Sequence, residues 1–587
     1  MKEPPLHVST QPGNGAGLRS VVRRRLPVLR GMLSGTGLFV GALFFAASLT
    51  PTLVPRTYAA EGVLAGLCLA AGYSIGLVCR HLWIYMKLPE PRGPLSRILG
   101  LAAASFGVLL AAAMLWQAPQ WQNAIRARMD LDPVTGVYSV RIVLVALITF
   151  LSVMALVYLF RFAFRAASTR FHRFLPRRVA QVAGLVAVVI LFWLVANGVI
   201  FRLAFHMLDS SFATYDALLD PELPQPTNPA MIGSPASLLT WDKLGRRGRE
   251  YVASSPTAAE ITAATGRAAL KPIRVYAGQR SAETVEQRAR LALNELRRVG
   301  AFQRSILVVV TPTGTGWIDP AAMNSLEYLH GGDVASVALQ YSYFSSPLSL
   351  LFEPERGAEA ARALFAEVYG YWTTLPKDAR PRLYVHGLSL GSLNSEKSVE
   401  LFEVLGDPIQ GALWSGPPFV SRLWRSTTDG RLPGSPAWLP RFRDDAFIRF
   451  MNQDGFASPA ETPWGVMRIV YLQYASDPVT FFDYRDLYRR PDWMAEPRGP
   501  DVSPELRWYP VVTMLQLAFD MAVATTTPIG FGHVFAPEHY VDAWMSVTGI
   551  RDWLPDRVAA LKQHLRQEMA ADLAREGEEN PYTGRGG

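Results

Sequence analysis

Cysteine is almost absent from this chain, and its two copies lie close together. Among 587 residues only Cys68 and Cys79 occur; Cys68 lies in the second of the apolar segments described below, and Cys79 directly follows that segment. Residues 203–587 therefore contain no disulfide bond and no thiol nucleophile. We expect neither a bound metal nor a cofactor.

Charged residues are missing from five long runs before residue 202. These runs cover residues 33–53, 62–78, 98–116, 142–160 and 179–201. Each is close to the ~17–25 apolar residues that a helix needs to cross a bilayer, and core helices of soluble proteins rarely stay uncharged for so long. We therefore predict an all-α transmembrane bundle of five spans at residues 31–202, in contact with the lipid bilayer. No small-residue cleavage site follows the first run, so a cleaved signal peptide is not expected.

Small residues within the runs predict how the helices pack. Glycines four residues apart let two membrane helices approach closely, and such pairs occur at 37 and 41, 62 and 66, and 72 and 76. Ion or substrate paths through a membrane are marked by charged side chains inside the spans. Because these runs have none, we expect the bundle to act as an anchor; the alternative is a bundle with a lateral opening for a lipid substrate.

Basic residues predict the orientation of the spans. Arginine and lysine are concentrated before the first run, between the second and third, and between the fourth and fifth. The positive-inside tendency then places the basic tail at residues 1–30 in the cytoplasm, and five spans place everything after the fifth run outside. This corresponds to a multi-pass protein of the inner (cytoplasmic) membrane with an extracytoplasmic, periplasmic C-terminal region.

The charge balance changes along the chain. The first 209 residues hold 21 Lys and Arg against 6 Asp and Glu, and since the whole chain carries +9, the remainder carries −6. The excess of basic residues therefore belongs to loops beside anionic lipid, and we expect no nucleic-acid partner. Nothing in the sequence indicates an oligomeric state.

From residue 271 onward, strand and helix patterns alternate. The apolar run at 306–310 is rich in β-branched residues, which is typical of a strand buried on both faces. Strands separated by helices predict a mostly parallel sheet covered by helices. The predicted strands are 273–276, 306–310, 334–343, 383–385, 411–414 and 466–474, and the predicted helices include 284–299, 358–375, 390–405 and 540–547.

The chain after the bundle divides into three parts by composition. We assign residues 203–270 to a connecting segment, residues 271–565 to an α/β catalytic domain, and residues 566–587 to a polar tail. Within the catalytic domain, residues 417–460 are rich in proline, arginine and aromatic residues, which predicts a cap-like insertion over the site.

The pattern Gly-x-Ser-x-Gly occurs twice, centred on Ser389 and Ser74. Between a strand and a helix this pattern forms the nucleophile elbow of α/β-hydrolases, in which a tight turn exposes the serine hydroxyl. Ser389 follows a predicted buried strand, whereas Ser74 lies inside a predicted membrane span and is interpreted as a packing residue. We predict Ser389 as a nucleophile; the alternative is a tight turn with a serine that caps the next helix.

A serine hydroxyl needs a base, and in α/β-hydrolases the acid and the histidine follow the serine in that order. Asp477 comes just after the predicted strand 466–474, where the acid belongs; the alternative role is the cap of a helix or turn before Pro478. Asp483 is the reserve acid. Among the histidines of the outer region we predict His533 as the base, because it follows glycines that let a flexible loop bend sharply. His539 is the reserve base.

The oxyanion formed on attack needs two backbone N–H donors. One is expected from Leu390, the residue after the nucleophile. The other is expected from the glycine-rich loop after strand 306–310, at Thr313 and Gly314. A phosphate-binding loop is a poor alternative, because the loop lacks the P-loop lysine.

Four stretches together resemble a family of bacterial membrane-anchored α/β-hydrolases with a multi-span N-terminal domain. They are LVVVTPTGTGWIDPAA, NSLEYLHGGDVASVALQYSYFSSPLS, YVHGLSLGS and VYLQYASDPV. The resemblance implies Ser389, Asp477 and His533 as the catalytic triad. At the positions of Gly530-Phe531-Gly532-His533, many relatives have Gly-His-Gly-His. Phe531 replaces the first histidine here, and His533 remains.

These observations lead to one main functional hypothesis and two alternatives. The main one is a membrane-anchored serine esterase or lipase-like hydrolase, which forms an acyl-serine on a lipid or cell-envelope ester outside the cytoplasm. The first alternative is an acyltransferase that moves the acyl group to an envelope glycan or lipid alcohol. The second is a non-catalytic hydrolase-like scaffold or sensor in the envelope.

Overall fold

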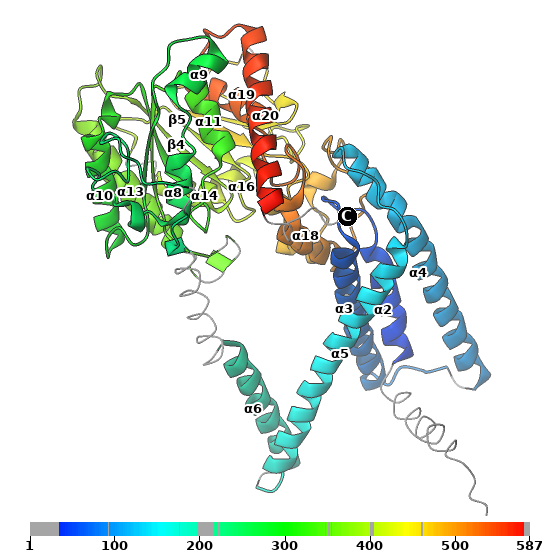
Figure 1. Cartoon of the computed structure of the whole chain (residues 1–587). Coiled ribbons are helices and arrows are strands. Elements are labelled where there is room, and N and C mark those ends of the chain that lie inside the picture. The colour runs from blue at the N-terminus through cyan, green and yellow to red at the C-terminus, as the bar shows by residue number, and fades with distance from the viewer. Residues whose placement is uncertain are drawn as a thin grey trace, which may run out of the picture. The chain divides into compact units, whose positions relative to one another are not determined.

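The structure is a computed structural model, and two compact units make up the chain. It describes residues 34–91, 93–174, 176–197, 216–220, 223–344, 346, 348–349, 353, 355–399, 404–459 and 462–579. The first unit comprises Met1–Thr50, Tyr58–Gln120 and Thr135–Tyr158, and the second comprises Pro51–Thr57, Trp121–Val134 and Leu159–Gly587. Figure 1 shows the helical N-terminal region in blue and cyan and the sheet-containing region in green to red.

The N-terminal region consists of long apolar helices. They are α2 (Gly35–Ser48), α3 (Tyr58–Tyr85), α4 (Pro94–Arg128), α5 (Tyr138–Phe171) and α6 (Arg177–Asn197). Within the described residues, α3, α4 and α5 are long and apolar enough to cross a membrane. Cys68 is buried in α3 and Cys79 is exposed there.

The prediction of five spans is wrong for the described part of the chain, where three helices qualify. The helix α2 has 14 residues, which at about 1.5 Å per residue is shorter than the ~30 Å hydrocarbon core. It stops because Thr50 precedes Pro51, and the residue before a proline disfavours helical geometry. In α6 the apolar helix covers Gln181–Leu191, and residues 198–201 of the predicted fifth span lie outside the described residues.

Glycines in α2 and α3 make the predicted close packing. A Cβ on Gly41 would lie 2.9 Å from the Leu69 carbonyl oxygen, and one on Gly72 would lie 2.8 Å from that of Val40. Another face of α3 meets α5, where a Cβ on Gly66 would lie 2.6 Å from the Ala146 carbonyl oxygen. Backbone therefore touches backbone at both contacts, which is the main source of attraction between helices in lipid.

An eight-stranded sheet forms the centre of the C-terminal region. Its strands are β1 (Ile273–Ala277), β2 (Ile306–Thr311), β3 (Val334–Leu339), β4 (Arg382–Leu388), β5 (Gly411–Ser415), β6 (Ile448–Asn452), β7 (Gly455–Phe456) and β8 (Arg468–Leu472). They lie in the order β1-β3-β2-β4-β5-β8-β6-β7. All pairs are parallel except β6 and β7. Every residue of β2 and of β3 is buried, as expected for strands covered on both faces.

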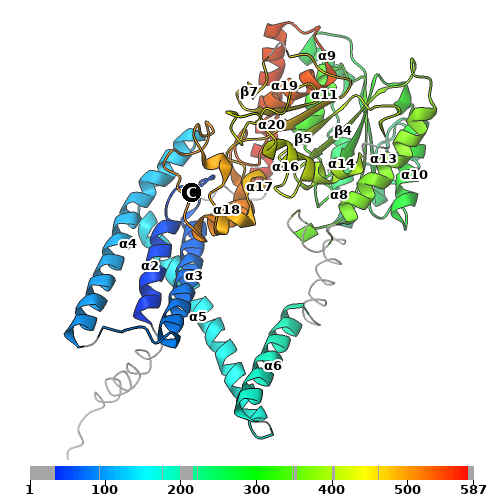
Figure 2. The same cartoon turned by 180° about the vertical axis from the view of Figure 1, so that it is seen from behind.

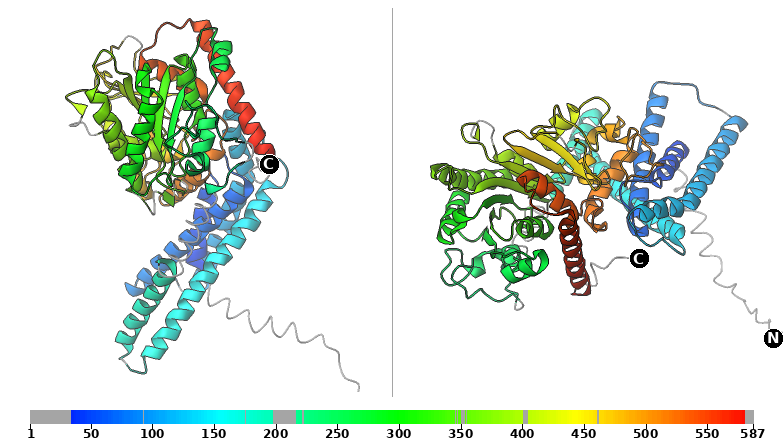
Figure 3. Two further views of the ribbon diagram at one scale, coloured as in Figure 1. Left: turned by 60° about the vertical axis from the view of Figure 1, so that its left-hand side comes forward. Right: turned by 90° about the horizontal axis from the view of Figure 1, so that it is seen from above.

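Helices cover both faces of this sheet (Figures 2 and 3). One layer is formed by α10 (Val285–Arg298), α13 (Arg356–Thr374) and α14 (Leu390–Ser398), and the other by α11 (Pro320–Leu329), α19 (Pro537–Thr548) and α20 (Pro555–Glu579). The expectation of an α/β-hydrolase fold with a mostly parallel sheet is confirmed. The boundaries of the remaining helices are α8 (Gly245–Ala253), α9 (Ala258–Thr265), α16 (Arg422–Asp429), α17 (Pro478–Phe481), α18 (Val512–Val523), η1 (Trp241–Lys243), η2 (Ala301–Gln303), η3 (Tyr484–Leu487), η4 (Asp492–Met494) and η5 (Ala524–Thr526).

Some segments differ from their sequence-based description. The region 417–460, expected to form a cap, contains α16 but also β6 and β7, which extend the sheet beyond β8. The expected polar tail at 566–587 is helical up to Glu579, because α20 continues that far. The predicted helix 390–405 ends at Ser398, and residues 400–403 lie outside the described residues. Within the connecting segment 203–270, the described part forms η1, α8 and α9.

The contact between α3 and α5 predicts a strong effect of Gly66→Val. Its side chain would meet the Ala146 carbonyl and Thr149, and such overpacking costs about 1–3 kcal/mol. The protein in detergent should unfold several degrees lower than wild type in a thermal scan. Gly100→Val in α4 is the control, since nothing lies within 4 Å of a Cβ there. Equal losses in the two variants would contradict the proposed packing.

Candidate active site

Ser389 occupies a strained turn between β4 and α14. Its φ of 56° and ψ of −127° are rare for a residue with a side chain. The two glycines of the motif allow this turn: a Cβ on Gly387 would lie 2.4 Å from the Gly391 backbone, and one on Gly391 would lie 2.3 Å from the Thr311 carbonyl oxygen. The Ser389 side chain makes no capping hydrogen bond to α14. The alternative of a helix-capping serine therefore has no support in the structure.

Ser74 is placed quite differently. It lies inside α3, and its hydroxyl donates a 2.8 Å hydrogen bond to the Ala70 carbonyl one turn earlier. This is ordinary behaviour for serine within a helix. The second Gly-x-Ser-x-Gly match forms no strand-to-helix turn, as the sequence context predicts.

Asp477 follows the end of β8 and is fully buried. One carboxylate oxygen accepts from the Val479 N–H at 2.9 Å, which caps the short helix α17. The other accepts from the Thr480 hydroxyl at 3.1 Å and contacts His533 Nδ1 at 2.7 Å. The two roles considered for Asp477, helix cap and partner of a histidine, are thus both present in the structure.

His533 is held in a short loop by its backbone. Its N–H donates to the Ala524 carbonyl at 3.1 Å, and the preceding Gly532 N–H donates to the Ser476 hydroxyl at 2.9 Å. Gly532 has a φ of +56°, which glycine adopts without strain. The imidazole lies against Gly416, where a Cβ would be 2.5 Å from His533 Cε1.

The hydrogen bond to Asp477 sets the chemistry of the imidazole. A carboxylate only accepts, so Nδ1 carries the proton and Nε2 of the neutral ring is an acceptor. Nε2 is buried and has no hydrogen-bond partner among the described residues. Such a nitrogen is suited to take a proton from a nearby hydroxyl.

The sheet register brings the serine and histidine to the same edge. The Ser389 N–H donates to the Ser415 carbonyl at 2.9 Å. Gly416, the residue after Ser415, packs against the imidazole of His533. The structure contains no hydrogen bond between Ser389 and Nε2. Bonds of this kind are often long without substrate and tighten when it binds.

The two reserve residues lie in other networks. Asp483 caps η3 and forms ion pairs with Arg425 at 2.9 Å and Arg485 at 2.7 Å. His539 Nδ1 and the Tyr474 hydroxyl form a hydrogen bond of 2.6 Å, and burial lowers the pKa of His539 to about 4. Both residues therefore have local structural partners, and within the described part of the chain no hydrogen bond or ion pair joins either of them to Ser389 or His533.

The other three histidines of this region are also in structural positions. His386 is buried in β4 and contacts the Leu413 carbonyl at 2.8 Å. His330 lies 3.1 Å from the Thr548 hydroxyl, and the ring of His564 packs against Tyr328. In the described part of the chain, no group of three or more His, Cys, Asp or Glu side chains is placed to hold a metal ion.

The expected oxyanion donors differ in their availability. Leu390 begins α14, so its N–H belongs to the first turn, which has no partner inside the helix. In contrast, the Thr313 N–H donates to the Trp317 carbonyl at 2.9 Å, and the Gly314 N–H donates to the Ser346 hydroxyl at 3.2 Å. Thr313 and Gly314 can therefore serve as donors only if this loop changes its hydrogen bonds when substrate binds.

Sequence reasoning did not identify two buried carboxyl groups near the histidine loop. Asp501 accepts from the Ser476 hydroxyl at 2.5 Å, and Ser476 in turn holds the Gly532 N–H. Asp319 accepts from the Tyr540 hydroxyl at 2.9 Å and caps α11. Burial raises the pKa of Asp319 to about 6, against the opposing effect of these hydrogen bonds. The Asp319-Pro320 sequence signals a helix start, but nothing in it indicates proximity to the site.

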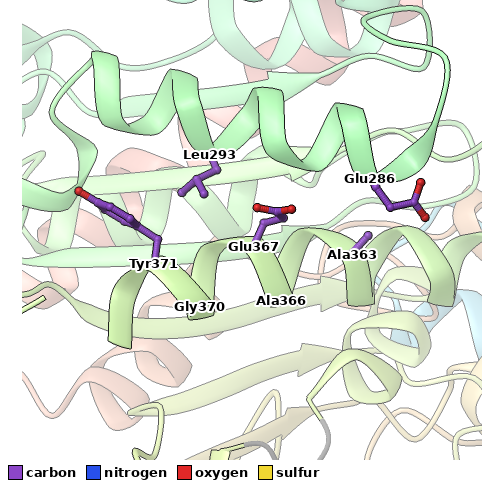
Figure 4. A pocket seen from close by; sticks show the side chains of 7 residues that line it. All are labelled: Glu286, Leu293, Ala363, Ala366, Glu367, Gly370 and Tyr371. Carbon is purple, nitrogen blue, oxygen red and sulfur yellow. The ribbon is translucent and has the colours of Figure 1, made fainter. Parts of the chain in front are cut away.

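Two surface cavities have different surroundings. One of about 270 Å³ lies between α16 and residues 480–493, and Thr480, which donates to Asp477, lines it together with aromatic and arginine side chains. The other, of about 440 Å³, lies between α10 and α13 (Figure 4). It is lined by Glu286, Leu293, Ala363, Ala366, Glu367, Gly370 and Tyr371, and it contains no nucleophile or histidine.

Comparisons with known proteins agree with this architecture. A family described as the alpha/beta-hydrolase family matches residues 273–561, and one described as its N-terminus matches residues 49–256. The two matches cover most of the chain, which therefore belongs to this α/β-hydrolase family. Searches of curated proteins and of solved structures found no match.

The contact between Gly416 and His533 predicts that Gly416→Ala displaces the imidazole. We expect labelling of Ser389 by a fluorophosphonate to slow by about tenfold or more, because misplacing a catalytic group by about 1 Å costs up to ~100-fold in rate. Gly434→Ala is the matched control. Gly416 and Gly434 both have positive φ, but nothing lies within 4 Å of a Cβ on Gly434. Similar labelling rates in the two variants would contradict the contact.

Proposed function

We propose that this protein is a membrane-anchored serine hydrolase that works through an acyl-serine intermediate. The observation that carries the proposal is the pair Asp477–His533, joined at 2.7 Å, with an unpartnered Nε2 at the sheet edge that holds Ser389. The strained, uncapped turn at Ser389 supports the role of this residue as nucleophile. Membership of the α/β-hydrolase family is consistent with both.

In the proposed reaction, Ser389 Oγ attacks the ester carbonyl carbon while His533 Nε2 takes the hydroxyl proton. Asp477 keeps the imidazole in the required tautomer and stabilises its charged form. The tetrahedral intermediate expels the alcohol, which receives the proton from Nε2, and an acyl-serine remains. Water then attacks the acyl-serine with the same base, which releases the acid and restores Ser389. The Leu390 N–H is one proposed donor to the oxyanion.

The proposed substrate is an ester of a membrane lipid or of an envelope component. Three apolar helices able to span a membrane would keep the enzyme beside such molecules. The cavity lined by Thr480, whose hydroxyl donates to Asp477, has aromatic, arginine and aspartate side chains in its lining, which suits an amphipathic molecule. We further propose that the N-terminus is cytoplasmic and that the catalytic domain is extracytoplasmic, from the distribution of basic residues.

Acyl transfer is a second candidate, and one observation favours it. Ser389 and His533 are only 9% and 7% exposed, respectively. Restricted access of water to an acyl-serine lengthens its lifetime and lets an alcohol acceptor compete. The same side chains would act in the same way, and only the acceptor would differ.

Labelling with a fluorophosphonate tests the nucleophile directly. The purified wild-type protein should be labelled, and Ser389→Ala should lose the label because the attacking oxygen is gone. His533→Ala and Asp477→Asn should each slow labelling by ~100-fold or more, since an unactivated serine is a weak nucleophile. Ser74→Ala is the control and should be labelled like wild type. A wild-type protein that is never labelled would favour the non-catalytic scaffold, and loss of label in Ser74→Ala alone would overturn the assignment.

The proposed orientation is testable because cysteine is so rare. In a Cys79→Ser background, Asp378→Cys places a thiol at an exposed position of the catalytic domain. A membrane-impermeant maleimide added to intact cells, with the outer membrane permeabilised where one is present, should label it as fully as in lysed cells. Labelling only after lysis would place the catalytic domain in the cytoplasm.

A further inference from the structure

The segment Pro51–Thr57 connects α2 to α3 but belongs to the same compact unit as the sheet. Leu53 and Val54 are fully buried and form part of the hydrophobic core that includes the sheet strands. A loop between two apolar helices would ordinarily be exposed and polar. This segment is therefore built into the α/β-hydrolase region.

Arg56 of this segment forms a buried ion pair with Asp520 of α18. Both side chains are fully buried, and the shortest distance between them is 2.6 Å. Arg56 Nε donates to Asp520 at 2.8 Å, and its Nη2 also donates to the Gln516 carbonyl at 3.1 Å. The Leu53 N–H donates to the same carboxylate at 3.2 Å. The segment thus holds two successive turns of α18 by charge and by backbone hydrogen bonds.

The other end of α18 holds His533. Ala524 begins η5 directly after α18, one helical turn beyond Asp520. Its carbonyl accepts the His533 N–H at 3.1 Å and lies 3.1 Å from the Thr527 hydroxyl. Between Thr527 and His533 the loop turns at Gly532, where a Cβ would lie 2.6 Å from the Thr527 hydroxyl oxygen. A shift of α18 would therefore move the carbonyl on which the backbone of His533 depends.

We propose that Arg56 and Asp520 are positioning residues for His533. Through them, the connection between α2 and α3 sets the place of α18, and α18 sets the backbone of the histidine that contacts Asp477. Neither residue touches Ser389, and neither takes part in proton transfer. The inference rests on the proposed function, because it concerns the base of that reaction.

A purely structural role is the alternative, and the chain contains a matched control for it. Arg274 and Glu327 form another fully buried ion pair, at 2.7 Å, between β1 and α11. Removing one partner leaves an unpaired buried charge in either case and destabilises the fold. No hydrogen bond of Arg274 leads to α18 or to the histidine loop: its partners are Glu327, Asn324, Ser254 and the Tyr251 carbonyl.

The test uses the full-length protein in lipid nanodiscs with the variants Arg56→Gln, Arg56→Lys and Arg274→Gln. Three quantities are measured: the unfolding temperature, the maximal rate and half-saturating concentration of fluorophosphonate labelling, and amide hydrogen exchange of residues 524–536. Arg56→Gln should lower the maximal labelling rate by about tenfold or more with the half-saturating concentration unchanged. Exchange of the His533 amide should increase in the same variant. Arg56→Lys should recover part of both, because it restores a positive charge beside the Asp520 carboxylate.

The control separates the outcomes. Arg274→Gln should lower the unfolding temperature while leaving the labelling rate and the exchange of residues 524–536 as in wild type. The inference is overturned if Arg56→Gln labels and exchanges like wild type, or if Arg274→Gln slows labelling equally at an equal loss of stability. Failure of the proposed function looks different: the wild-type protein is then not labelled at Ser389, and exchange of residues 524–536 alone decides whether Arg56 holds the loop.

Discussion

The hydrogen bond between Asp477 and His533 is the contact on which the proposed chemistry depends. It joins two residues 56 positions apart, and each is held by backbone contacts of its own. Asp477 is fixed by the cap of α17, and His533 by the Ala524 carbonyl and, through Gly532, by Ser476. Because Asp477 satisfies Nδ1, the remaining ring nitrogen is left as a buried acceptor at the sheet edge. An acceptor without a partner is costly to bury, and a catalytic site is where such a cost is expected.

Much of the sheet was predictable from sequence because its central strands are buried on both faces. In β2 and β3 an unbroken apolar run is the physical consequence of that burial. The strands β6 and β7 at one end of the sheet are not predicted from the sequence, although every residue of β6 is buried. In β6, Arg449 interrupts the apolar pattern, and only the structure reveals that its guanidinium packs over Trp464 and donates to the Asp445 and Thr462 carbonyls. The apolar run at 33–53 likewise predicts one span, although its helical part ends before Pro51.

The candidate site was predicted in part, and the limit is set by hydrogen bonds that span long stretches of chain. Ser389 is recognisable from its motif because two glycines must flank the turn. The preference for His533 over His539 rested on loop flexibility and on a resemblance, whereas the structure separates them by the Tyr474 hydroxyl bound to His539. The Thr313 and Gly314 amides have the expected position after β2, but the direction of a backbone N–H in a turn cannot be read from residue types.

The ion pair of Arg56 with Asp520 also has a consequence for how the protein is made. The two residues are 464 positions apart, and at about 5–20 residues per second the ribosome needs roughly 25–90 s between them. During that time Leu53, Val54 and Arg56 have no α18 to pack against, although all three are buried in the finished fold. The core of the α/β-hydrolase unit therefore includes side chains from a segment far upstream of its sheet. The contact forms only when α18, which is synthesised late, meets the segment between the early apolar helices α2 and α3.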